Sequence, residues 1–311
     1  MKILITRFDD PGDVLWTTPV VRCIKKQFPP ASVHYLTNHG NEKLLKSNAY
    51  IEKLFLYHGD AHLTGELKEE NYDLLIDLQN DRESREIRKK LEVKTFLVLE
   101  TSWLGRILGN SSRRQHKAVR FMNTVSSVCR YDGKGLDFFI PASGMIAEKD
   151  IPASHQLGYI AFAIGGLSST ERISVKKIRE FCQELDHPVI LLGDQGSRLT
   201  GEEISSADPV KIYNASGKFN FSETGDLVKR CKVLISYDKG MIAMASALRK
   251  PVISIWTGNC PLADMQPFYP DAEVMKTPPH AVMKRFDKVV LREKLGAILS
   301  KIQNSNSLTE G

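Results

Sequence analysis

The sequence lacks the signatures of several common protein classes. No apolar run in its 311 residues approaches the roughly eighteen residues that a membrane-spanning helix needs. Charged and turn-forming residues follow Thr6 at once, so we expect no signal peptide at the start of the chain. Neither GxGxxG nor GxxxxGK followed by Ser or Thr occurs. The dinucleotide oxidoreductases and the P-loop NTPases therefore lose their main sequence support.

Cysteine is scarce as well. The chain has five cysteines, an odd number, and they are widely scattered without any CxxC pair. This pattern suggests neither a zinc site nor a disulfide framework. No cluster of histidines or carboxylates has the spacing of metal ligands. We therefore expect reduced thiols, a cytoplasmic location, no bound metal and no cofactor.

What the chain does contain is typical of a globular protein with a basic surface. The hydrophobic fraction is 42%, the charged fraction 26% and the net charge +6. Basic residues gather from Arg82 to Lys90 and again at Arg113, Arg114, Lys117 and Arg120. Two interpretations stand: these are solvated faces, or they attract anionic lipid or an anionic ligand at a membrane surface. No interleaved aromatics accompany the charge, so we expect no nucleic-acid partner.

Short apolar runs alternate with helical patterns along the whole chain, which predicts parallel sheets with crossover helices. In the first half, the predicted strands are 3–6, 33–36, 53–57, 74–77 and 95–99, and the predicted helices are 19–27, 42–48, 82–91 and 120–129. In the second half, the predicted strands are 159–164, 189–192, 211–214, 233–236 and 252–255, and the predicted helices are 174–185, 221–231, 241–248 and 289–303.

The length suits two domains. A turn-rich stretch precedes residue 150 and separates the two series of strands. We therefore predict an N-terminal domain over 1–150, a C-terminal domain over 151–303 and a disordered tail over 304–311.

The first twenty residues are the most informative stretch. Lys2 to Thr6 predicts a buried strand, a turn containing Gly12 and Asp13 follows, and a helix is expected to start at Val14. Open parallel sheets place their ligands at the carboxyl ends of strands, which is where Asp13 would lie. Two roles are open for Asp13: a general base that faces a ligand, or an N-cap of the following helix.

The order strand, Arg, Gly12-Asp13, then Thr17-Thr18-Pro19 resembles the start of glycosyltransferase family 9, the bacterial heptosyltransferases. Asp9 and Asp10 depart from the small residues usual there. The resemblance implies a GT-B fold, an α/β architecture of two Rossmann-like domains whose parallel sheets face a central cleft. It also implies that Asp13 is the base and that Gly12 and Thr17 lie on the acceptor side.

Two further segments of the first half are similar to the family. Asp77-Leu78-Gln79-Asn80 matches a motif that opens the acceptor side, and a basic helix with Arg82, Arg85 and Arg88 follows it. The resemblance implies that Gln79, Asn80 and Arg82 face the acceptor. His116 and Arg120 match the family's His-x-x-x-Arg before a helix.

The second half is similar to the family's donor site. Asp238-Lys239-Gly240-Met241 stands at a predicted helix start, where backbone N–H groups and the helix dipole favour a diphosphate. Upstream, Gly165-Gly166 and Thr170-Glu171-Arg172 resemble the phosphate-binding loop, so the resemblance implies donor binding by Gly165, Gly166, Thr170, Arg172, Asp238, Lys239, Gly240 and Met241. Four positions differ from the family: Glu171, Lys239, Ala243 and Thr257.

By resemblance, the expected function is an inverting glycosyltransferase. It would move heptose or a related sugar from a nucleotide diphosphate, expected to be ADP, to an anionic glycolipid acceptor of lipopolysaccharide type. Peripheral contact with the inner membrane would accompany such an acceptor. The alternative is a catalytically degenerate relative that binds a glycan or protein partner without turnover, and the substitutions at Glu171, Lys239 and Ala243 favour it.

Overall fold

The structure, a computed structural model, describes residues 1–59, 61–100, 115–165, 173–256, 262–269 and 280–307. The chain divides into two compact units between Phe139 and Ile140. This division falls earlier than the predicted boundary near residue 150, because the intervening segment is bonded to the second unit. Ile146 N donates to Asp226 Oδ2 at 3.0 Å, and Arg230 Nη2 donates to Ile146 O at 2.6 Å.

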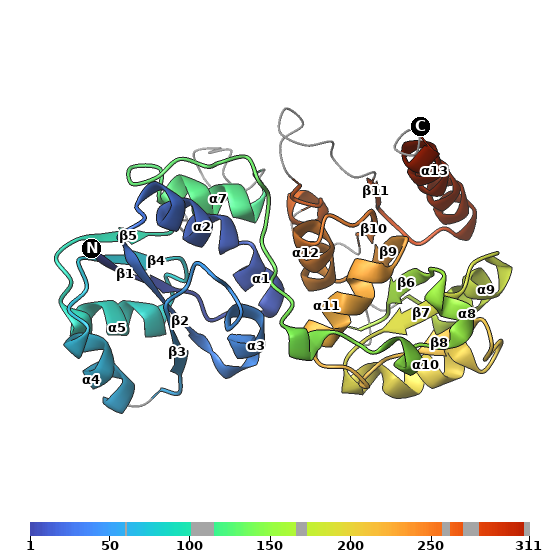
Figure 1. Cartoon of the computed structure of the whole chain (residues 1–311), viewed down its shortest axis with the longest axis horizontal. Coiled ribbons are helices and arrows are strands. Elements are labelled where there is room, and N and C mark those ends of the chain that lie inside the picture. The colour runs from blue at the N-terminus through green and yellow to red at the C-terminus, as the bar shows by residue number, and fades with distance from the viewer. Residues whose placement is uncertain (60, 101–114, 166–172, 257–261, 270–279, 308–311) are drawn as a thin grey trace. The chain divides into compact units, whose positions relative to one another are not determined.

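Unit 1 contains a parallel sheet with the strand order β3-β2-β1-β4-β5 in the described residues (Figure 1). All five strands were predicted from the sequence; β1, β2 and β4 are mostly buried, and strands buried on both faces read as short apolar runs. In the structure they are β1 (Lys2–Thr6), β2 (Ser32–Asn38), β3 (Lys53–Tyr57), β4 (Leu74–Asp77) and β5 (Phe96–Val98).

Helices cover both faces of this sheet. On one face, α4 (Ala61–Glu69) and α5 (Arg82–Leu91) pack through Leu63, Leu67 and Ile87 onto β-strand residues such as Leu4 and Leu75. The sequence analysis missed α4, which buries only the two leucines one turn apart. The other α-helices of unit 1 in the described residues are α1 (Pro11–Leu15), α2 (Thr18–Gln27), α3 (Glu42–Leu45) and α7 (Lys117–Thr124).

Unit 2 contains a second parallel sheet, with the order β11-β10-β9-β6-β7-β8 in the described residues (Figure 1). Five of these strands match the predictions and β11 was missed. Their bounds are β6 (Ile160–Ala163), β7 (Val189–Leu192), β8 (Ile212–Asn214), β9 (Val233–Ser236), β10 (Val252–Ile255) and β11 (His280–Met283).

One face of this second sheet carries a continuous apolar core under three helices, α9 (Val175–Glu184), α10 (Arg198–Ser205) and α13 (Lys288–Ser307). The remaining α-helices that the structure describes in unit 2 are α8 (Ala153–Gln156), α11 (Phe221–Arg230) and α12 (Lys239–Ala247). The prediction of a disordered tail from Asn304 is wrong at its start, since α13 continues to Ser307. Residues 308–311 lie outside the described residues.

Four cysteines lie in the described residues, and all four are free and buried. Burial raises the pKa of the Cys23 thiol to about 11 and that of Cys129, Cys182 and Cys231 to about 12. These thiols are therefore protonated at neutral pH and poor nucleophiles. In the described part of the chain, no helix has both the length and the apolar content to span a membrane.

Candidate active site

Asp13 lies in α1, the single helical turn that follows β1. The helix begins at Pro11, three residues before the predicted start at Val14, and Asp10 is its N-cap residue. Proline is favoured at the first helical position, where a missing N–H costs nothing. Asp13 is therefore inside the helix, and the interpretation that it caps the helix is wrong.

Two cations of the described residues contact the carboxylate of Asp13. Lys117 Nζ lies 2.7 Å from Asp13 Oδ2, and Arg7 Nη2 lies 3.3 Å from the same oxygen. The Asp13 side chain is only 4% exposed, and those of Arg7 and Lys117 are 3% and 19% exposed. A carboxylate this deeply buried requires charged or hydrogen-bonding partners, and the two cations provide them.

Arg7 is fixed by further contacts. Its Nη1 donates to Leu78 O at 2.6 Å, the Phe121 ring centre lies 5.1 Å from its guanidinium carbon, and it forms an ion pair with Asp9. Asp9 is one of the two acids that depart from the family pattern. Arg7 is a shared partner of Asp9 and Asp13, so it offsets the repulsion between these two carboxylates.

Gln79 and Asn80 form the turn after β4, the strand next to β1. The Gln79 side chain donates to Asp9 Oδ1 at 2.9 Å and accepts from Phe8 N at 3.1 Å. Asn80 has a φ of 52°, a left-handed conformation that asparagine tolerates, and it donates to Leu99 O at 2.7 Å. The structure thus brings Gln79 to Asp9, the ion-pair partner of Arg7, whereas the Asn80 side chain is hydrogen-bonded to the residue after β5.

Gly12 and Thr17 lie in the same turn and are both buried. Thr17 Oγ1 donates to Val14 O at 2.7 Å and lies 2.7 Å from Tyr35 Oη. Burial raises the pKa of Tyr35, so its hydroxyl stays protonated. Because Thr17 is fully buried, its hydroxyl supports the turn in this conformation and does not reach solvent.

The second cation at Asp13 comes from the start of α7. His116 is the N-cap of this helix, with Nδ1 accepting from Ala118 N at 3.0 Å and its ring 5.1 Å from that of Trp16. Lys117 Nζ lies 5.7 Å from the centre of the Trp16 ring. The sequence analysis singled out His116 and Arg120 but counted Lys117 only as part of a basic cluster. The predicted helix 120–129 starts earlier in the structure, so Lys117 is its first residue.

The three arginines of α5 have different surroundings. Arg82 is 92% exposed and pairs with Glu86 at 3.3 Å. Arg85 Nε donates to Asn80 Oδ1 at 2.9 Å, and Arg88 forms an ion pair at 2.9 Å with the buried Asp77. The interpretation of this helix as a solvated basic face therefore holds for Arg82 but not for Arg88.

In unit 2, the predicted donor residues Gly165 and Asp238 follow the neighbouring strands β6 and β9. Ala163 and Ser236, at the ends of these strands, are register partners. The strand order changes direction between β6 and β9, and such switch points form the ligand crevice of open α/β sheets.

A pocket of about 300 Å³ opens at this edge of the sheet. A Cβ on Gly165 would come within 3.1 Å of Gly193 Cα, which is a tight contact, so a larger residue there would require the neighbouring backbone to shift. Among the described residues that line the pocket, Asp194 and Asp238 are the charged ones. The described residues that line it are Ala163, Gly165, Leu192, Gly193, Asp194, Phe219, Phe221, Thr224, Asp238 and Met241.

Asp238 is the N-cap residue of α12. Its Oδ1 accepts from Gly240 N at 2.5 Å and from Met241 N at 3.1 Å. The expectation that these backbone N–H groups are open to a diphosphate is therefore wrong in this conformation, because the aspartate already caps them. Lys239 is the first residue of the helix and is partly exposed.

Other residues named from the family pattern fall elsewhere. Ala243, at the position of the family's histidine, is 1% exposed and belongs to the core. Gly166, Thr170 and Arg172, together with Glu171 and Thr257, lie outside the described residues. Among the described residues, no group of three or more His, Cys, Asp or Glu side chains is arranged to hold a metal ion.

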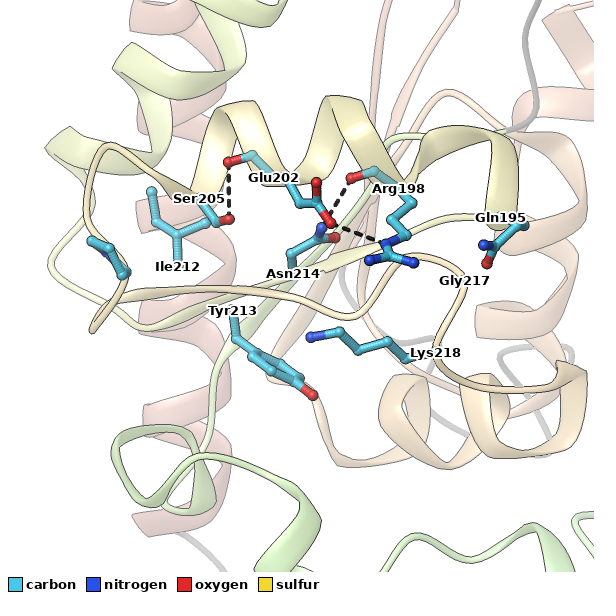
Figure 2. A pocket seen from close by; sticks show the side chains of 10 residues that line it. Gln195, Arg198, Glu202, Ser205, Ile212, Tyr213, Asn214, Gly217 and Lys218 are labelled. Carbon is cyan, nitrogen blue, oxygen red and sulfur yellow. Dashed lines mark hydrogen bonds and ion pairs between the residues drawn. The ribbon is translucent and has the colours of Figure 1, made fainter.

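Unit 2 also has a larger hollow of about 570 Å³ between α10 and β8, which no predicted site residue lines in the described part of the chain. Figure 2 shows the Lys218 side chain reaching toward Tyr213 and the Arg198 guanidinium held by Glu202 on α10. Lys218 Nζ lies 4.4 Å from the Tyr213 ring centre. We assign no ligand to this hollow.

The chain is similar to known proteins in its sequence and in its fold. The model of glycosyltransferase family 9 (heptosyltransferase) matches residues 176–294. The resemblance to glycosyltransferase family 9 is confirmed. The lipooligosaccharide heptosyltransferase 2 of Haemophilus influenzae is 23% identical over 301 residues, which covers 84% of each chain.

Two solved structures show the same fold. A family 9 glycosyltransferase of Veillonella parvula superposes with a TM-score of 0.76 at 16% identity, over 96% of this chain and 97% of that one. The ADP-heptose lipopolysaccharide heptosyltransferase II of Escherichia coli gives 0.75 at 15% identity, over 97% of this chain and 100% of that one. The chain thus has the GT-B fold.

Proposed function

We propose that this chain is an inverting glycosyltransferase that transfers heptose or a related sugar from ADP to an anionic acceptor of lipopolysaccharide type. The observation that carries the proposal is Asp13. Its carboxylate is buried at the carboxyl end of β1 and contacts Lys117 and Arg7. This strand and β4 flank the switch point of the unit 1 sheet, where ligands of such folds bind.

In this reaction Asp13 acts as the general base. It takes the proton of an acceptor hydroxyl while the hydroxyl oxygen attacks the anomeric carbon of the donor sugar. The bond from that carbon to the diphosphate breaks, the nucleoside diphosphate leaves with the bonding electrons, and the anomeric configuration inverts. Arg7 orients the carboxylate, since its own position is fixed by Leu78 O and Asp9.

The donor would bind at the pocket beside Gly165 and Asp238. The aromatic and aliphatic lining suits a nucleoside, and the carboxylates of Asp194 and Asp238 suit its hydroxyl groups, which are donors. The ADP-heptose assignment draws support from the Escherichia coli structure that shares the fold. The lipopolysaccharide-type acceptor draws support from the Haemophilus influenzae relative.

A second candidate is a relative that binds without turnover. Two observations favour it: the family's histidine position is the buried Ala243, and the N–H groups of Gly240 and Met241 are capped by Asp238. This candidate and the enzyme differ in one outcome, namely whether ADP-heptose is consumed.

The test combines calorimetric titration with ADP and ADP-heptose and an assay of heptose transfer to a deacylated lipopolysaccharide core oligosaccharide. The proposal expects binding below millimolar concentration and turnover that Asp13→Asn lowers by at least about a hundredfold. Asp10→Asn, in the same turn but exposed, is the matched control and should retain activity. ADP-heptose binding without consumption would favour the second candidate, and no binding at millimolar concentration would sink the donor assignment.

A further inference from the structure

Lys117 and Arg7 contact the same carboxylate oxygen of Asp13. Both Lys117 Nζ, at 2.7 Å, and Arg7 Nη2, at 3.3 Å, approach Asp13 Oδ2. A carboxylate that is paired with two cations is a weak proton acceptor, because the cations favour its charged form. If Asp13 is the base, the structure shows it with its carboxylate paired to Lys117 and Arg7 and not yet ready to accept a proton.

The two cations differ in their freedom to move. The Arg7 guanidinium is 3% exposed and is held at the same time by Leu78 O, Asp9 and the face of Phe121. The Lys117 ammonium stands at the end of a flexible four-carbon chain, and its side chain is 19% exposed. Lys117 is therefore the cation that can leave Asp13 without dismantling the turn.

We propose that Lys117 is an acceptor-recognition residue that exchanges Asp13 for a phosphate group of the acceptor. This inference rests on the proposed function, in which Asp13 is the base. When the acceptor's anion takes the Lys117 ammonium, the carboxylate loses one of the two cations that contact it in the described part of the chain, and it faces the acceptor hydroxyl. Lys117 thus releases the Asp13 carboxylate for proton abstraction only when the correct, anionic acceptor is present.

If Lys117 exchanges Asp13 for the acceptor, a specific effect on acceptor binding follows. A Lys117–Asp13 ion pair that only stabilises the fold would not produce this effect. Asp13 and an anionic acceptor compete for the same ammonium group, so removing the Asp13 charge must tighten acceptor binding. Removing the Lys117 charge must weaken it. Asp13 and Lys117 contact each other, yet their removal would change the affinity for the acceptor in opposite directions. This pattern is specific to competition between Asp13 and the acceptor for Lys117.

The experiment measures binding of a phosphorylated, deacylated lipopolysaccharide core oligosaccharide by calorimetry, with its dephosphorylated form as the matched ligand. For the phosphorylated form we expect Lys117→Met to weaken binding about tenfold and Asp13→Asn to tighten it about fivefold. Lys117→Arg should stay close to the unmodified protein, since it keeps the charge. The dephosphorylated form should bind equally to all four proteins.

The double variant Asp13→Asn, Lys117→Met completes the cycle and should match Lys117→Met alone, since no ammonium group remains to be released. A folded Asp13→Asn protein that binds the phosphorylated form no better than the unmodified protein would overturn the inference. Thermal unfolding verifies folding. If Asp13→Asn does not fold, equal affinity of Lys117→Met and Lys117→Arg for the phosphorylated form overturns it instead.

Binding and transfer separate this inference from the proposed function. If none of the proteins transfers heptose but the two variants shift acceptor affinity in opposite directions, the exchange of Lys117 is supported and the proposed enzymatic function is refuted. If heptose transfer depends on Asp13 but the two variants do not shift acceptor affinity in opposite directions, the proposed enzymatic function is supported and the exchange of Lys117 is refuted. In an active enzyme, Lys117→Met should raise the KM for the phosphorylated acceptor about tenfold and change kcat much less.

Discussion

Arg88 Nη1 lies 2.9 Å from Asp77 Oδ2, and this ion pair joins the last turns of α5 to the carboxyl end of β4. The Asp77 side chain is fully buried. It also accepts hydrogen bonds from Ser84 Oγ at 3.1 Å and from the backbone N–H groups of Gln79 and Asn80 at 3.1 and 2.7 Å. Asp77 is therefore the anchor of the turn that presents Gln79 to Asp9.

We expect Arg88→Ala to lower the free energy of unfolding by about 3 kcal/mol, because it leaves a buried carboxylate without its cation. Arg82→Ala, on the same helix and 92% exposed, should change it by less than about 0.5 kcal/mol. Urea denaturation of the two variants measures the difference. Equal effects would mean that the Arg88–Asp77 pair is no more important than a surface pair.

The exposed cations of α5 predict salt-dependent attraction to anionic surfaces. Arg82, Lys89 and Lys90 are exposed, whereas Arg88 is committed to Asp77. Replacing these three exposed residues by alanine should weaken binding to vesicles that contain anionic lipid, and salt should weaken the binding of the unmodified protein. Sedimentation with anionic and with zwitterionic vesicles measures this. Binding that ignores salt, or that the triple variant retains in full, would leave α5 as a solvated face.

The buried His155 predicts a dependence of stability on pH. Its Nε2 lies 3.1 Å from both Val189 O and Lys211 O, so this nitrogen carries the proton in the neutral ring. Burial lowers the pKa of His155 below its usual value of about 6.5. Below pH 6.5 the unfolded chain therefore binds a proton that the folded chain does not, and stability is lost as the pH falls.

We expect the free energy of unfolding to decrease more steeply between pH 7.5 and pH 5.5 in the unmodified protein than in His155→Gln. Glutamine keeps an N–H donor for the two carbonyl oxygens but does not titrate. Urea denaturation across this range measures both slopes. Parallel slopes would show that His155 does not contribute to the pH dependence.

The regular elements were predictable where one physical signal dominated. Strands such as Leu74–Asp77 are buried on both faces, so they read as apolar runs regardless of their neighbours. The helix α10 was missed because it is largely polar and contains Gly201. That glycine is explained only by the fold, since a Cβ there would lie 2.2 Å from Asn214 Oδ1.

The candidate site was predictable only in part, for a similar reason. Asp13 follows a strand and a glycine, a local pattern that can be read from the sequence. The cation that covers it, Lys117, is 104 positions away and belongs to a different helix. No periodicity or spacing connects the two residues, so their contact follows only from the packing of α7 beside the turn. The same holds for the ion pair of Arg88 with Asp77.

The donor pocket leads to a last prediction, which concerns Lys239. The carboxylates of Asp194 and Asp238 line this pocket, and Asp238 already caps the N–H groups of Gly240 and Met241. A diphosphate there needs a cation, and Lys239, the first residue of α12, supplies one beside the pocket. We therefore expect Lys239→Thr to weaken ADP binding about tenfold, or about 1.4 kcal/mol, and to leave adenosine binding unchanged.

Two measurements separate this role of Lys239 from an ordinary surface lysine. Lys176→Thr, which changes an exposed lysine in the first turn of α9, is the matched control and should leave ADP binding unchanged. A cation at a helix N-terminus is unfavourable by about 0.3–1 kcal/mol, so Lys239→Thr should slightly stabilise the ligand-free protein while it weakens ADP binding. Stability that rises without any loss of ADP affinity would show that Lys239 faces solvent and that the diphosphate, if it binds, is held elsewhere.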